Sequence, residues 1–91
     1  MDSLTIVASV SIFSAALSVG LGSFGSSYGE AGIAREAMHS IAQQPDETDN
    51  ITKVLFMSMA MVESSAIYCL VISMILIFAN PFWNALLQRI N

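Results

Sequence analysis

The chain has 91 residues, of which 55% are hydrophobic and 11% are charged, with a formal net charge of −4. Charged residues make up about a quarter of an ordinary soluble domain, so the composition excludes that class and indicates a membrane protein. Three basic residues that form no patch exclude a nucleic-acid interface.

The first apolar segment predicts one helix over about residues 4–42, with small residues three and four apart on one face. In lipid, small side chains let helix backbones approach closely. A dimer is one interpretation, but a broad face that takes a neighbour on each side favours a closed ring of identical copies. The predicted packing residues are Gly22, Gly25, Gly29 and Gly32, in line with Ser11, Ala15 and Ser18 and beside a second line of Ala16, Gly20, Ser23, Ser27 and Ala31.

A polar segment at about residues 43–50 predicts the turn, because Pro45 disfavours helical geometry at the residue before it. A second helix is expected over about residues 51–80, followed by an interfacial tail at 81–91. The fold class is therefore an all-α membrane protein, in which residues 1–91 form one transmembrane hairpin domain. Arg35 and Lys53 beside the loop, against Arg89 near the other end, predict a cytoplasmic loop with both termini outside.

Two carboxyl groups interrupt the apolar segments. Glu63 is the only charged residue between Val54 and Ala79, and Glu30 lies in the first helix at an equal distance, in residues, from the polar segment. A hairpin therefore brings both to the same depth, roughly 20 Å from the loop and inside the hydrocarbon. Because a carboxyl group is costly there, this pair predicts an ion site or a proton relay.

Ser64 follows Glu63 directly, and Tyr68 lies one turn farther along the same helix. With Glu30 they form a set of hard oxygen ligands that suits Na⁺ or H⁺ and not zinc or copper. The residues leave the choice between the two ions open, and they also leave open that Ser64 and Tyr68 only hydrogen-bond to the backbone or to a neighbouring helix. The sequence contains no nucleophile–base pair, phosphate loop or metal motif, so we expect neither catalysis by this chain alone nor a resident cofactor.

These features together resemble the c subunit, the rotor-ring proteolipid, of F-type ATP synthases. The resemblance covers the whole chain, and its most specific parts are Glu63-Ser64 with Tyr68 and the run Ala79-Asn80-Pro81-Phe82. It implies a ring of copies in the lipid of a prokaryotic inner membrane, which turns against the a subunit of the stator and couples ion flow to rotation. It also implies that Glu63 carries the ion, and that the loop at Gln43, Gln44 and Pro45 contacts the gamma and epsilon subunits of the central stalk.

Two departures from the family pattern stand out. The family's alternating glycines are partly replaced here by serine and alanine, which favours a wider ring, and Gln43 stands where a basic residue usually precedes the Gln-Pro pair. With Glu30, the second departure points to the N-type branch of these enzymes. The rival hypothesis is a holin-like pore-forming oligomer, and a structural component of a membrane complex is a weaker third. Neither rival requires two carboxyl groups at matched depth.

Overall fold

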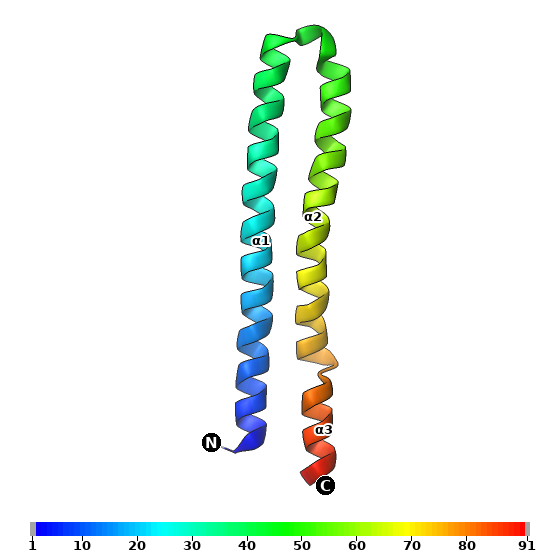
Figure 1. Cartoon of the computed structure of the whole chain (residues 1–91). Helices are drawn as coiled ribbons and strands as arrows, with labels where there is room; N and C mark the ends of the chain where they lie inside the picture. Colours follow the sequence, from blue (N-terminus) through cyan, green and yellow to red (C-terminus); the bar gives the residue numbers. More distant parts are fainter. Residues whose placement is uncertain (1, 91) are drawn as a thin grey trace.

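The computed structural model, which describes residues 2–90, is an antiparallel hairpin of two long helices whose termini lie at the same end (Figure 1). Helix α1 spans Ser3–Gln43, the short 3-10 helix η1 spans Pro45–Glu47, α2 spans Thr48–Phe78 and α3 spans Pro81–Ile90. The predicted hairpin fold is confirmed. Asn91, the last residue of the predicted tail, lies outside the described residues.

Local chemistry explains where each helix begins and ends. Asp2 caps α1, because its Oδ1 accepts a 2.8 Å hydrogen bond from the backbone N–H of Thr5. At the other end, Gln44 adopts a non-helical conformation before Pro45, and its N–H donates to the carbonyl of Ser40 at 2.8 Å. The chain therefore turns within a few residues.

The hairpin is long compared with a bilayer. Its longest dimension is 68 Å, whereas the hydrocarbon core of a membrane is about 30 Å thick. The helical stretches Ser3–Gln43 and Pro45–Ile90 are each long and apolar enough to cross it. One or both ends of the hairpin therefore project beyond the hydrocarbon.

The half of the hairpin nearest the termini is held by hydrogen bonds between α1 and α2. Ser73 donates to the carbonyl of Ala15 at 2.7 Å, and Ser18 donates to the carbonyl of Cys69 at 3.2 Å. Ala15 and Ser73 are buried, with exposed fractions of 2% and 4%. Such contacts suit a membrane, where packing and hydrogen bonding, and not apolar burial, hold helices together.

Asn80 joins three helices at the break between α2 and α3. Its Nδ2 donates to Ser11 Oγ at 2.6 Å and to the carbonyl of Leu76 at 3.2 Å. Its Oδ1 accepts from the backbone N–H groups of Phe82 and Trp83, at 2.9 and 3.2 Å, and so caps α3 directly before Pro81. Asn80 therefore satisfies its whole amide group while only 6% exposed.

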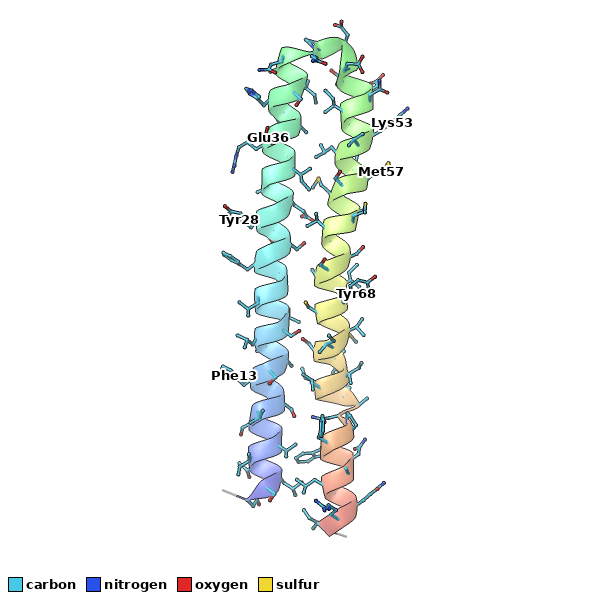
Figure 2. All side chains as sticks on the ribbon, viewed as in Figure 1. Phe13, Tyr28, Glu36, Lys53, Met57 and Tyr68 are labelled. Atoms are coloured by element: carbon cyan, nitrogen blue, oxygen red, sulfur yellow. The ribbon has the colours of Figure 1, made fainter. Side chains whose placement is uncertain are left out.

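Most large apolar side chains remain exposed. A single hairpin has too few layers to bury them, and buried apolar residues of the described chain are the small Ala15 and Ala37. Figure 2 shows side chains such as Phe13 and Tyr28 projecting outward from α1. In a membrane these surfaces face lipid or further copies of the chain.

Candidate functional site

The two carboxyl groups extend from neighbouring positions on the facing helices. A Cβ added to Gly29 would lie 3.3 Å from Val62 Cγ1, so these two residues meet across the hairpin. Glu30 directly follows Gly29, and Glu63 directly follows Val62, so the two lie at similar heights. Each side chain points about 100° around its own helix from the contact. Because the helices run antiparallel, the same turn takes both side chains to the same side of the hairpin, which we call the carboxylate flank.

The two carboxyl groups differ in surroundings. Glu30 is half-buried, and its Oε1 is shielded from solvent without a hydrogen-bond partner within the described hairpin. Glu63 is exposed on the flank. Because buried polar atoms ordinarily have a partner, this oxygen leaves one hydrogen-bonding position open.

The hydroxyl groups of Ser64 and Tyr68 do not lie on the carboxylate flank. Cys69 faces α1, since its Sγ would lie 2.6 Å from a Cβ at Gly22, and Tyr68 precedes it by about 100°. Tyr68 therefore extends from the other side of the hairpin, which we call the hydroxyl flank, about 140° around α2 from Glu63. It is 68% exposed and points away from α1 (Figure 2). Ser64 lies about 40° from Tyr68 around the helix, and its hydroxyl donates to the carbonyl of Ala60 at 3.0 Å.

One hairpin thus supplies the four candidate ligands on two different flanks. Within the described residues, no group of three or more histidine, cysteine, aspartate or glutamate side chains could hold a metal ion. Glu30 and Glu63 lie at similar heights, and Ser64 and Tyr68 lie within about one and a half turns of Glu63 along α2, but a single copy does not gather the four side chains around one ion.

The four predicted packing glycines also divide into two pairs. Gly22 and Gly29 meet α2 inside the hairpin, whereas a Cβ at Gly25 or Gly32 would find no atom within 4 Å. Gly25 directly precedes the buried Ser26 and so turns toward the hydroxyl flank. The first pair serves the hairpin itself, and the second leaves open surface on that flank.

The three predicted loop residues lie at the tip of the hairpin. Gln43 ends α1 and its Nε2 lies 3.1 Å from Nε2 of His39. Gln44 forms the turn, and the carbonyl of Pro45 accepts a 2.6 Å hydrogen bond from the Thr48 hydroxyl. All three are exposed, and they form a short, hydrogen-bonded tip available to a partner.

Comparison with known proteins identifies the family. The family model for the ATP synthase C subunit matches residues 13–76. The chain belongs to the ATP synthase c-subunit family. It is 49% identical over 72 residues to ATP synthase c subunit 2 of Cereibacter sphaeroides (strain ATCC 17029 / ATH 2.4.9), covering 79% of this chain and 87% of that one. It is 48% identical over 82 residues to the ATP synthase c subunit of Synechococcus sp. (strain JA-2-3B'a(2-13)), covering 90% and 99% of the two chains. A relative from Prochlorococcus marinus (strain AS9601) is 45% identical over 82 residues.

Membership confirms the predicted function. The chain is an ion-translocating component of the rotor ring in a membrane ATP synthase complex, and it has no catalytic role of its own. The holin-like alternative finds no support. Identical copies of the chain therefore stand side by side in a ring.

Sequence reasoning did not single out Ser73, and it named Ser18 and Asn80 without predicting their hydrogen bonds between helices. Their partners lie more than fifty positions away in sequence, so only the register of the two helices reveals them. Polar side chains at intervals of seven residues, as at Ser73 and Asn80, were the available signal.

Proposed function

We propose that Glu63 carries the transported ion, H⁺ or Na⁺, and that the complete site forms between adjacent copies of the ring. The observation that carries this proposal is the position of Glu63. It is the only charged residue between Lys53 and Arg89, and it is exposed on one flank of α2. A carboxyl group within a membrane-spanning helix is costly, so in an ion-translocating protein we expect it to act in the ion path.

Ring symmetry supplies the missing ligands. Copies related by rotation about the membrane normal bring the carboxylate flank of one copy against the hydroxyl flank of the next. Glu30 and Glu63 of one copy then face Ser64 and Tyr68 of the neighbour. Four oxygen-bearing side chains around one position suit Na⁺, whereas a carboxyl pair that shares a hydrogen bond suits H⁺.

The cost of an unpaired charge in lipid drives the proposed cycle. Each Glu63 is neutral while it faces hydrocarbon, through a proton or through a cation balanced by one ionised carboxyl group. A water-accessible, positively charged surface on the a subunit of the stator favours the ionised form and releases the ion. A second access path reloads the site. The membrane potential contributes about 2.3 kcal/mol per charge per 100 mV, so each ATP requires several ions.

The surrounding complex follows the same proposal. The exposed tip at Gln43, Gln44 and Pro45 contacts the gamma and epsilon subunits of the central stalk. Arg35 and Lys53 beside the tip support a cytoplasmic tip, with both termini on the other side of a prokaryotic inner membrane. Glu30, together with the absence of a basic residue at position 43, supports assignment to the N-type branch.

Carbodiimide labelling of the intact ring tests the ion site. Carbodiimides react with a protonated carboxyl group and not with one whose oxygens hold a metal ion, so we expect Glu63 to be the principal labelled residue by peptide mass spectrometry. Added Na⁺ slows labelling at fixed pH if the site binds Na⁺, and Glu30→Gln weakens that protection. If the site binds H⁺, labelling depends on pH and ignores Na⁺. A ring in which Glu63 stays unlabelled at acidic pH contradicts the proposal.

A further inference from the structure

The hairpin has a groove between α1 and α2 near the loop, which we call the loop-end groove. It has a volume of about 360 Å³, and its apolar wall comprises Ile33, Ala37, Ile51, Val54 and Leu55. An apolar hollow of this kind holds no water firmly and leaves its lining atoms without dispersion contacts. In the assembled ring we therefore expect an apolar group to fill it.

The groove opens on the hydroxyl flank. Besides the apolar wall it is lined by Glu36 and Asn50, which each lie about 100° before an inward-facing residue, Ala37 or Ile51. A residue that follows an inward-facing residue points to the carboxylate flank, so a residue that precedes one, as Glu36 and Asn50 do, points to the hydroxyl flank. Gly25 and Gly32, which have open space beside them, lie farther along the hydroxyl flank. The groove thus continues the surface that each copy presents to its next neighbour.

Rotation about the membrane normal keeps residues of equal number at equal height. The occupant of the groove must therefore come from the carboxylate flank of the neighbour, near the height of residues 50–58 of α2. Phe56 and Thr52 lie 7 and 11 residues before Glu63, so both point to the carboxylate flank. Phe56 is 65% exposed there, whereas Thr52 is half-buried and its hydroxyl bonds to the carbonyl of Thr48 at 2.7 Å. A helical side chain leans toward the N-terminus of its helix, which moves the Phe56 ring toward the middle of the groove.

We propose that the loop-end groove of each copy receives the Phe56 side chain of the neighbouring copy. This proposal rests on the ring assembly of the family and names a specific contact within it. Through this contact the cytoplasmic ends of adjacent hairpins interlock about two helical turns from Glu63. Phe56 is therefore a residue that fixes the spacing of neighbouring copies on the loop side of the ion site.

A cysteine pair tests the contact in the purified intact ring. In a Cys69→Ser background, Phe56→Cys is combined with Val54→Cys. These two positions lie about 160° apart on one helix, so they cannot link within a copy. We expect a short bifunctional thiosulfonate to produce a ladder of dimers and larger species on denaturing gels. The matched pair Lys53→Cys with Leu55→Cys, also about 160° apart on the helix, keeps one thiol in the groove and moves the other to the outward face of α2, and it should give little ladder.

Native mass spectrometry of the same samples separates the possible failures. A ring of full mass without a ladder, or an equal ladder in both pairs, overturns the Phe56 contact and leaves the ring intact. A lipid that stays bound to the full-mass ring while the ladder is absent identifies a lipid chain as the occupant and also overturns the contact. Absence of a ring in the unsubstituted chain contradicts the rotor function. As a second readout, Phe56→Ala should lower the temperature at which the ring dissociates in detergent, and Phe56→Leu should restore part of that loss.

Discussion

Replacing Asn80 by alanine removes a side chain that is hydrogen-bonded to α1, α2 and α3. The variant loses the Ser11 bond, which as a hydrogen bond between membrane helices contributes about 0.6 kcal/mol. It also loses the cap on the N–H groups of Phe82 and Trp83, which contributes about 1 kcal/mol. Together these shift the docking equilibrium of α3 by roughly tenfold toward the undocked state.

Trp83 reports this change directly, because it is the only tryptophan of the chain and lies half-buried in α3. For Asn80→Ala rings in lipid nanodiscs we expect a shifted Trp83 emission and faster quenching by a water-soluble quencher. Ser11→Ala removes only the bond to α1 and should shift the equilibrium roughly threefold. Asn84→Ala, an exposed neighbour, is the control. Unchanged Trp83 emission and quenching in Asn80→Ala would refute the reasoning.

Two further predictions concern α1. A Cβ at Gly22 would lie 2.6 Å from Cys69 Sγ and 2.8 Å from its Cβ, so Gly22→Ala should push the two helices apart. Maleimide labelling of Cys69, measured by mass spectrometry, should then be faster in Gly22→Ala than in Gly25→Ala, where the added Cβ meets no atom within 4 Å. Equal labelling rates in the two variants would count against the register of the helices. The backbone N–H of Thr5 lowers the pKa of Asp2 below 3.8, so its capping is complete above that pH and is lost as the pH falls through the lowered pKa. The protection factor of the Thr5 amide, which compares its exchange rate with that of an unstructured amide at the same pH, should therefore fall in acid, and Asp2→Asn should remove this pH dependence. An unaltered acid response in Asp2→Asn would show that another group is responsible.

The hairpin could be predicted from the sequence because two simple constraints determine it. The apolar segments are long enough to cross a bilayer, and Pro45 ends the first helix within a polar segment. The matched depth of Glu30 and Glu63 follows from the same turn, and the contact between Gly29 and Val62 agrees with it.

The direction in which each side chain points was harder to predict. The spacing of three and four residues placed Gly22 and Gly25 on one broad face, yet only the register against α2 separates the glycine that packs inside the hairpin from the one that stays open. Tyr68 likewise lies about one and a half turns from Glu63 along α2 but on the other flank. The spacing of residues along one helix determines their angles relative to one another around that helix. It does not determine which of them face the partner helix, because that depends on contacts with residues far away in the sequence.

Ion transport by the assembled complex tests the central claim most directly. The complex is reconstituted into liposomes, and ATP-driven uptake of H⁺ and of Na⁺ is measured for the parent chain, for Glu63→Gln and for Asp2→Asn, which removes a carboxylate at the far end of the hairpin. We expect Glu63→Gln to abolish uptake of the transported ion while native mass spectrometry shows a ring of full mass. Asp2→Asn should transport as the parent does. Sustained ion uptake by the Glu63→Gln complex would contradict the assignment of Glu63 as the ion carrier.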